Sequence, residues 1–261
     1  MRARLSRFVY AVCTAFTRLV VHSLARVEVV GLGLVPDGGP LILVANHVHL
    51  LDPPLVAACV RRRVHPMAKR ELFEIPLIGW FFHAYGAFPV RRFSADMGAL
   101  RVARNILRNG EAVLMFPEGT RGRRAGTVTE LRPALPGSAV VAQMSQATVV
   151  PVAITGSNVP LPGVFWAWAL GRRPAIRVEF GTPFTVAEPS AGGGSPEVET
   201  DRLMRRIASM LPESHRGAYG AASEGTVVVL REARERPPRP TLAERAAAEA
   251  AERADEDAPT P

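Results

Sequence analysis

Six short runs rich in valine and isoleucine recur along the chain, separated by segments in which apolar residues repeat every three or four positions. Runs of this length and composition predict β-strands, and the spacing between them predicts helices. The six runs cover residues 26–31, 40–46, 86–90, 112–116, 148–155 and 175–181. Strands that alternate with helices predict an α/β fold, in which a largely parallel mixed sheet is flanked by helices.

Two of the helical segments carry recognisable boundaries. Residues 94–110 begin with Ser94, whose hydroxyl suits the N-cap position, and they end at Gly110. Residues 196–211 begin with Pro196, which is favoured in the first turn of a helix. Each segment has an apolar stripe, so we expect both helices to pack against the sheet.

The chain of 261 residues suits one α/β domain with attachments. We expect a helical segment over residues 1–27, an α/β domain over 28–215 and a tail over 216–261. From residue 231 the tail is rich in Pro, Ala and charged residues and has little to bury. This composition predicts a disordered C-terminal tail, with a transient helix over 242–254.

The first segment has apolar residues at helical spacing, namely Leu5, Phe8, Val9, Val12, Phe16, Leu19 and Val20. Arg7, Thr14 and Arg18 fall on the other face. The longest uncharged run, residues 8–17, is ten residues long, whereas spanning a bilayer takes about 20. The pattern therefore predicts an amphipathic helix in the membrane interface, with arginines that reach phosphate headgroups. An amphipathic helix packed on the core is the alternative.

The formal net charge of +8 is carried almost wholly by arginine, since Lys69 is the only lysine. A basic chain can bind nucleic acid, anionic lipid or phosphorylated substrates. Zinc-finger spacing, an RNP-like aromatic motif and a helix-turn-helix signal are all missing, so we expect no nucleic-acid partner. The two cysteines, Cys13 and Cys59, provide neither a disulfide framework nor a thiolate metal site, and they fit a reducing compartment.

Residues 46–52, with the sequence NHVHLLD, follow a predicted strand and allow three interpretations. In the first, Asp52 is merely the N-cap of a helix. In the second, His47 and His49 bind a metal, but the spacing to Asp52 is wrong and no third ligand follows. In the third, Asp52 folds back and keeps one ring nitrogen of His47 protonated, so that the other can accept a proton.

Residues 116–121, with the sequence FPEGTR, follow another predicted strand. Gly119 permits a sharp turn that exposes backbone N–H groups, and the guanidinium of Arg121 matches a phosphate. Glu118 could hold that arginine or contact a substrate hydroxyl. Taken alone, the same residues also suit a strand-ending turn with a surface ion pair.

The two motifs in this order resemble those of the glycerolipid acyltransferases, specifically the 1-acylglycerol-3-phosphate (lysophosphatidate) acyltransferase group. Residues 86–92 resemble a second block of that family, with Arg92 as its arginine, and residues 149–154 resemble a fourth block, with Pro151 as its proline. Together the blocks span residues 28–182.

This sequence departs from the family pattern at three places. His49 and Gly122 stand where the family often has serine, and Arg132 stands where the family has the lysine of a Phe-Lys-x-Gly element.

The resemblance implies that His47 is the general base and that Asp52 orients it. The residues implied in substrate binding are Asn46, Arg92, Glu118, Gly119, Thr120, Arg121 and Pro151. The donor would be acyl-CoA or an acyl carrier protein, and the acceptor 1-acyl-glycerol-3-phosphate, with phosphatidic acid as product and no cofactor or metal. The enzyme would lie on the cytoplasmic face of the cell membrane as a peripheral or monotopic protein.

Three alternatives stay open. The acceptor could be another lysolipid or a glycolipid, the enzyme could be a thioesterase that uses water, or the protein could bind lipid without catalysis. No GxSxG motif is present, which excludes the usual serine route to hydrolysis. Residues 163–173, with Trp166 and Trp168, suit either a second membrane contact or a core-packed aromatic segment.

Overall fold

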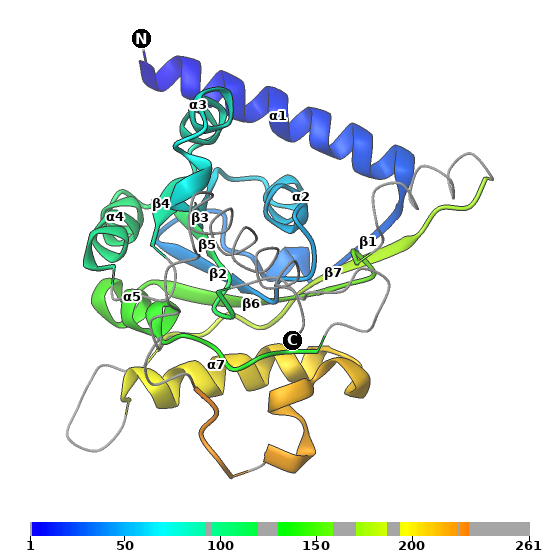
Figure 1. Ribbon diagram of the computed structural model, residues 1–261, viewed down its shortest axis with the longest axis vertical. Coiled ribbons are helices and arrows are strands. Elements are labelled where there is room, and N and C mark those ends of the chain that lie inside the picture. Colours follow the sequence, from blue (N-terminus) through cyan, green and yellow to red (C-terminus); the bar gives the residue numbers. More distant parts are fainter. Residues whose placement is uncertain are drawn as a thin grey trace, which may run out of the picture. The chain divides into compact units, whose positions relative to one another are not determined.

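A computed structural model describes residues 2–91, 96–119, 130–158, 171–186, 194–223 and 225–229. Its centre is a seven-stranded sheet in the order β1-β7-β6-β2-β5-β3-β4 (Figure 1). The strands are β1 (Arg26–Val30), β2 (Leu41–Ala45), β3 (Val64–Lys69), β4 (Phe88–Val90), β5 (Ala112–Met115), β6 (Thr148–Thr155) and β7 (Ala175–Phe180). Every pairing is parallel except that of β6 with β7. The predicted largely parallel mixed sheet is confirmed.

Helices cover both faces of the sheet. Successive side chains of a strand point to opposite faces, so both faces carry apolar side chains that the helices bury. The helices are α1 (Arg2–Leu24), α2 (Asp52–Cys59), α3 (Pro76–Tyr85), α4 (Met97–Arg108), α5 (Gly137–Ser145) and α7 (Pro196–Met210). Ile42 and Val44 of β2 join the core under α4, α5 and α7, whereas Leu41 and Leu43 join the core under α1 and α2 (Figure 1). Strand β2 is thus buried on both faces.

Five short 3₁₀ helices connect these elements: η1 (Leu32–Leu34), η2 (Arg70–Leu72), η3 (Glu213–His215), η4 (Gly217–Tyr219) and η5 (Ala221–Ser223). The last of them show that the packed chain runs past residue 215, where the tail was expected to begin. Tyr219 is buried, accepts a hydrogen bond from Ala134 N–H and donates one to Val228 O. The described part of the compact unit therefore reaches Val229, and the rest of the predicted tail, from residue 230, lies outside the described residues.

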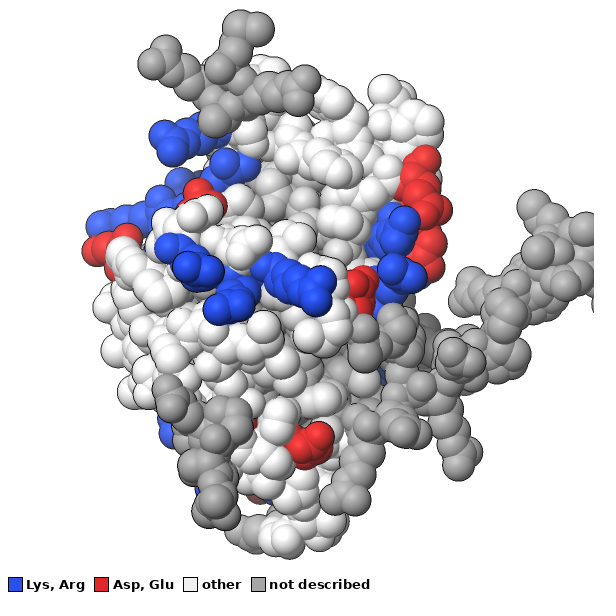
Figure 2. Space-filling view, turned by 90° about the vertical axis from the view of Figure 1, so that its left-hand side faces the viewer, with Lys and Arg blue, Asp and Glu red and all other residues white. Residues whose placement is uncertain are grey.

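Helix α4 begins at Met97, and its N-cap is Asp96, not Ser94 as predicted. The carboxylate of Asp96 accepts hydrogen bonds from Ala99 N–H and Arg91 N–H, which fixes the entry to the helix. Ser94 lies outside the described residues. The outer side of α4 is basic, and Figure 2 looks onto this side of the molecule.

Helix α1 turns its apolar stripe away from the sheet. Leu5, Phe8, Val12, Phe16 and Leu19 are between 50% and 67% exposed. The alternative prediction, in which this stripe packs on the core, is therefore wrong. No helix in the described part of the chain is both long enough and apolar enough to cross a bilayer.

The inward side of α1 carries polar side chains that are used within the protein. The guanidinium of Arg18 donates to Ala58 O at 2.5 Å and to Val60 O at 3.2 Å, which satisfies carbonyls at the end of α2. The hydroxyl of Tyr10 accepts a hydrogen bond from Val64 N–H. Arg18 was predicted to reach lipid headgroups, but its guanidinium is bound by the protein, because the end of α2 needs donors.

Candidate active site

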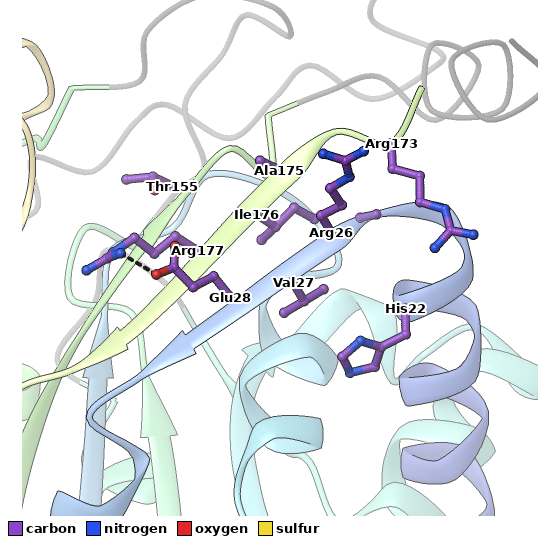
Figure 3. Close-up of a pocket in the computed structure, with 10 residues that line it drawn as sticks. His22, Arg26, Val27, Glu28, Thr155, Arg173, Ala175, Ile176 and Arg177 are labelled. Atoms are coloured by element: carbon purple, nitrogen blue, oxygen red, sulfur yellow. Dashed lines mark hydrogen bonds and ion pairs between the residues drawn. The ribbon is translucent and has the colours of Figure 1, made fainter. Parts of the chain in front are cut away.

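A pocket of about 520 Å³ lies at one edge of the sheet, where α1 leads into β1 (Figure 3). Three exposed arginines, Arg26, Arg173 and Arg177, lie around it together with His22. None of the site residues predicted from the sequence lines this pocket. The polar residues that the sequence singled out instead gather at the carboxyl end of β2.

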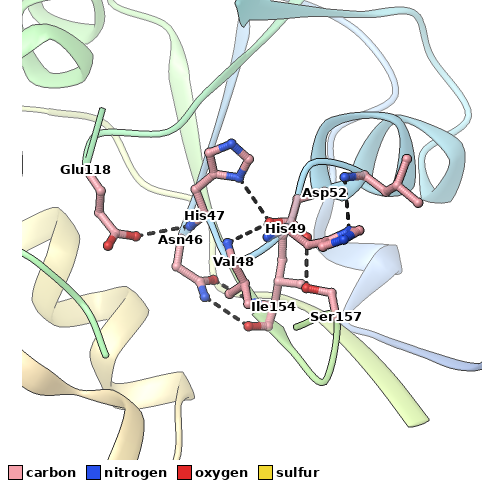
Figure 4. Close-up of polar contacts among 9 residues, drawn as sticks. Asn46, His47, Val48, His49, Asp52, Glu118, Ile154 and Ser157 are labelled. Carbon is pink, nitrogen blue, oxygen red and sulfur yellow. Dashed lines mark hydrogen bonds and ion pairs between the residues drawn. The ribbon is translucent and has the colours of Figure 1, made fainter. Parts of the chain in front are cut away.

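His47 and Asp52 come together as predicted. Strand β2 ends at Ala45, so His47 lies just beyond the carboxyl end of a central strand, where α/β proteins place their ligands. Asp52 is the first residue of α2. The Nδ1 atom of His47 is 3.0 Å from Oδ2 of Asp52, and the side chains are 6% and 0% exposed (Figure 4).

The Asp52 carboxylate is held from several directions. Its Oδ2 also accepts hydrogen bonds from Val48 N–H at 2.7 Å and His49 N–H at 2.6 Å (Figure 4). These bonds fold residues 46–52 into a tight loop, so Asp52 does not act as the predicted N-cap. Leu51 occupies the N-cap position without a side-chain bond.

This arrangement sets the tautomer of His47. The other described partners of the Asp52 carboxylate, Val48 N–H, His49 N–H and the Ser157 hydroxyl, are all donors. The carboxylate therefore acts as acceptor, which assigns the hydrogen of the His47 ring to Nδ1. The lone pair of the neutral ring is then on Nε2, which is the arrangement that a general base needs.

Ser157 was missed from the sequence. Its hydroxyl donates to Oδ1 of Asp52 at 2.8 Å, and its side chain is buried (Figure 4). Ser157 follows β6 in the segment Gly-Ser-Asn, at the same edge of the sheet as His47. A polar residue directly after the strand that contains Pro151 was the available signal.

Glu118 supports His47 from the other side. Strand β5 ends at Met115, and the chain turns at Gly119, whose φ of 66° lies in the left-handed region. The turn directs Glu118 inward, where Oε1 accepts from His47 N–H at 3.0 Å and Oε2 accepts from Arg132 N–H at 3.2 Å. Glu118 thus positions the main chain of His47, and the sharp turn predicted at Gly119 is confirmed.

The environment of Glu118 changes its acidity. The side chain is only 3% exposed, and this burial raises the pKa of Glu118 to about 7, although the two backbone N–H donors and the Arg132 side chain act in the opposite direction. A carboxyl group next to the candidate base therefore titrates close to neutral pH.

Asn46 links β2 to β6. Its amide donates to Ile154 O at 2.9 Å and accepts from Ile154 N–H at 2.7 Å, and the side chain is buried (Figure 4). Both polar atoms of the side chain are therefore occupied by the main chain. These bonds fix the end of β2, and the substrate-binding role that the family resemblance implies for Asn46 stays a prediction.

The other predicted residues divide into two groups. Pro151 lies within β6 opposite Val44 of β2, and its ring packs so closely against Gly181 that a Cβ at position 181 would lie 2.9 Å from it. Pro151 therefore does not join the polar group around His47. Arg92, Thr120 and Arg121 lie outside the described residues, as does most of the segment 163–173.

The surroundings do not resemble a metal centre. Nδ1 of His49 accepts a hydrogen bond from Leu51 N–H at 3.3 Å within its own loop. Across the described ranges, no group of three or more His, Cys, Asp and Glu side chains could hold a metal ion. The ring of His47 instead lies against the ring of Phe116, with centroids 4.2 Å apart.

Comparison with known proteins gives a consistent result. A family model described as "Acyltransferase" matches residues 26–155, which include both polar motifs. The 1-acyl-sn-glycerol-3-phosphate acyltransferase of Streptococcus pneumoniae is 30% identical over 149 residues, which are 56% of this chain and 51% of that protein. The protein of the same name from Bacillus subtilis is 29% identical over 57% of this chain and 72% of its own length. This chain thus spans about half of the Streptococcus relative.

A solved structure shares the fold. The crystal structure of the 1-acyl-sn-glycerophosphate acyltransferase from Thermotoga maritima superimposes with a TM-score of 0.58, covering 80% of this chain and 83% of that chain. The two sequences are 22% identical. At this identity, the similarity is evidence of a common fold.

Proposed function

The chain belongs to the acyltransferase family, and from this premise we propose that it transfers a fatty acyl group from a thioester to the hydroxyl of 1-acyl-glycerol-3-phosphate. The product would be phosphatidic acid. The observation that carries the proposal is the buried contact between His47 and Asp52 at the carboxyl end of β2.

His47 is the proposed general base. Its Nε2 takes the proton of the acceptor hydroxyl while the hydroxyl oxygen attacks the thioester carbonyl carbon. The carbon–sulfur bond then breaks, and the proton passes from His47 to the leaving thiolate. Because a thioester is already activated, no acyl-enzyme is needed, and base catalysis contributes about 10²- to 10⁴-fold.

Asp52, Glu118 and Asn46 hold this base in place. Asp52 keeps the hydrogen on Nδ1, Glu118 binds the main-chain N–H of His47, and Asn46 ties the end of β2 to β6. A base that is fixed by three separate contacts loses little orientational freedom when the substrate binds.

The burial of His47 favours transfer over hydrolysis. With 6% of the side chain exposed, the ring is shielded from bulk water. Exclusion of water protects the thioester from hydrolysis until an alcohol occupies the site. This observation supports an acyltransferase over a thioesterase.

The acceptor phosphate is assigned to Arg92 and Arg121. Both arginines occupy the motif positions of the family, and a guanidinium forms paired hydrogen bonds with phosphate oxygens. The donor is acyl-CoA or an acyl carrier protein, since both present the same activated thioester.

A membrane surface is the proposed location, on its cytoplasmic side. The exposed apolar residues of α1 are joined by Leu77 and Trp80 of α3, which are 84% and 62% exposed. Helices α1 and α3 are in contact (Figure 1). Apolar side chains on two adjoining helices suit insertion among lipid headgroups, where the acceptor and the product reside.

The membrane proposal is tested by sedimentation with phospholipid vesicles. The variant Phe8→Ser/Phe16→Ser/Leu19→Ser should lose most of its vesicle binding, because each serine removes apolar area from the buried face. Val102→Ser on α4 removes an apolar side chain that is 41% exposed elsewhere and is the matched control. Equal binding by wild type and the triple variant would exclude α1 as the membrane contact.

The reaction is tested with a panel of acceptors and one acyl-CoA, with products identified by mass spectrometry. Phosphatidic acid should be the main product from 1-acyl-glycerol-3-phosphate, and other lysolipids should react more slowly. Faster transfer to another lysolipid would identify that lysolipid as the acceptor in place of 1-acyl-glycerol-3-phosphate. Free fatty acid formed at the same rate without acceptor would indicate a thioesterase, and absence of turnover would indicate a lipid-binding protein.

A further inference from the structure

The outer face of α4 presents three arginines in a row. Arg101, Arg104 and Arg108 are spaced by three and four residues, so they lie on one side of the helix, and all three are exposed. Ala103 and Leu107 on the opposite side are buried in the core. Figure 2 shows a row of basic side chains across the side of the molecule that carries α4.

Arg108 lies in the last turn of α4, where a cation suits the helix dipole, but none of the three arginines forms an ion pair that the structure describes. The ion pairs found among the described residues involve none of the three, and α4 itself contains no acidic residue. On α7 the arrangement is different, because Arg202 pairs with Glu199 and Arg205 pairs with Asp201, each at 2.7 Å. Three like charges on one helix face repel each other slightly. The α4 arginines are therefore best explained by a partner.

Membrane contact through α1, as proposed above, argues against the membrane as that partner. Helix α4 packs on the face of the sheet that also carries α5 and α7, whereas α1 packs on the opposite face with α2 (Figure 1). A bilayer that contacts the outer side of α1 lies beyond α2, on the far side of the sheet from α4. The basic row thus faces the aqueous phase while α1 is bound to lipid.

The position of α4 also places it near the reaction. Helix α4 follows β4, and parallel strands end at the same edge of a sheet. The N-terminal end of α4 is therefore at the edge where His47 follows β2 and Glu118 follows β5. A partner bound to α4 can deliver a substrate on a flexible arm to this edge.

We propose that the arginines of α4 dock an acidic acyl carrier protein, which delivers the acyl thioester to His47. This inference rests on the proposed acyl transfer and specifies its donor. An acidic helix laid along α4 would place carboxylates opposite three guanidinium groups, each of which can bind a carboxylate through two hydrogen bonds. Complementary charge of this kind mainly raises the rate of productive encounter.

The test compares two donors on one enzyme. The variant Arg101→Glu/Arg104→Glu/Arg108→Glu is assayed with the same acyl group on a carrier protein and on CoA, using one acceptor. The ratio of kcat/KM for the carrier donor to kcat/KM for acyl-CoA should fall at least about tenfold, because reversed charges repel the carrier. Acyl-CoA turnover reports that the variant is folded and bound to the membrane.

The matched control is Arg26→Glu/Arg172→Glu/Arg173→Glu, which makes the same change of charge at exposed positions beside β1 and β7, the opposite edge of the sheet. Its donor ratio should equal that of the wild type. Added salt should lower the wild-type ratio and leave the ratio of the α4 variant nearly unchanged, since salt screens exposed charges.

Several results would overturn the inference. An unchanged ratio in the α4 variant would do so, as would an equal loss with both donors accompanied by weaker vesicle binding. If the wild-type enzyme used acyl-CoA but not the acyl carrier thioester, α4 would not be a docking surface for the carrier, and the proposed acyl transfer would still hold. Failure of both donors with every acceptor would remove the proposed function itself.

Discussion

Two histidine–carboxylate contacts of similar length occur in the part of the chain that the structure describes, and their surroundings differ. His47 Nδ1 is 3.0 Å from Asp52 Oδ2, and His65 Nε2 is 3.1 Å from Glu111 Oε2. The Asp52 side chain is fully buried, whereas 36% of the Glu111 side chain is exposed. Distance alone therefore does not distinguish a catalytic pair from a structural one.

The neighbours of each ring make the distinction. His65 Nδ1 lies 2.7 Å from Gly86 O, so the hydrogen of the neutral ring is used on a main-chain carbonyl, and Nε2 only lies beside the partly exposed Glu111 carboxylate. Burial lowers the pKa of His65, which favours the neutral ring. Asp52 instead receives several donors that hold it against His47. A catalytic histidine needs a rigid acid at one ring nitrogen. Of these two pairs, only His47–Asp52 provides such an acid.

The largest effect should come from replacing the acid of each pair by the corresponding amide. Asp52→Asn removes the acceptor that fixes the His47 tautomer, so kcat should fall about 10²- to 10⁴-fold while the KM for the acceptor changes little. Glu111→Gln, the equivalent change in the other pair, should leave kcat within about twofold of wild type.

Equal losses in the Asp52→Asn and Glu111→Gln variants would remove the distinction between the pairs. Thermal unfolding of each variant serves as the control, because a folded Asp52→Asn protein separates lost catalysis from lost structure.

The next effect concerns stability and pH at Glu118. The pKa of Glu118 in the folded protein is about 7, above the ordinary value of 4.5, so the folded state binds the proton more tightly than the unfolded state. The contribution of Glu118 to the free energy of unfolding is therefore fully present below pH 4.5 and is lost as the pH rises through 7. The shift corresponds to about 3 kcal/mol in the free energy of unfolding.

Glu118→Gln cannot ionise and should lack this pH dependence. Denaturant unfolding between pH 4.5 and 8 measures the free energy of unfolding of wild type and variant. As the pH rises, the wild type should lose stability relative to the variant. A difference that stays constant over this range would contradict a raised pKa for Glu118.

The smallest effect should come from Ser157, whose hydroxyl contacts Asp52. Ser157→Ala removes one of the donors to the Asp52 carboxylate, and the loss of one such bond is worth about 1 kcal/mol, or about fivefold in kcat. Ser157→Thr keeps the hydroxyl and should restore much of the rate. A loss in Ser157→Ala as large as that in Asp52→Asn would mean that Ser157 acts directly on the substrate.

Much of the fold was predictable from local pattern. The six apolar runs all form strands, because β-branched residues such as those of 148–155 pack well on a buried sheet. Strand β3 was missed because its sequence, VHPMAK, interrupts the apolar pattern with His65, Pro66 and Lys69. Its pairing with β5 is decided by tertiary contacts.

The orientation of α1 shows a second limit. Helical spacing of Leu5, Phe8 and Phe16 predicts a helix with an apolar stripe, but it does not tell which side faces the protein. The inward side is selected by the hydrogen bonds of Tyr10 and Arg18, whose partners are distant in sequence.

The candidate site divides in the same way. The return of Asp52 to His47 was predictable, because the short loop between β2 and α2, residues 46–51, brings the two side chains together. The contacts of Ser157 and Glu118 were not predictable in detail, since they join residues 105 and 71 positions apart in the chain. Such contacts depend on the order of strands in the sheet.

The most direct test of the account is the rate of acyl transfer by His47→Gln compared with His65→Gln, using acyl-CoA and 1-acyl-glycerol-3-phosphate. The account predicts that kcat/KM falls by at least about 10²-fold in His47→Gln and stays within about twofold of wild type in His65→Gln. A folded His47→Gln enzyme that keeps about a tenth of the wild-type kcat/KM would contradict the assignment of His47 as the base.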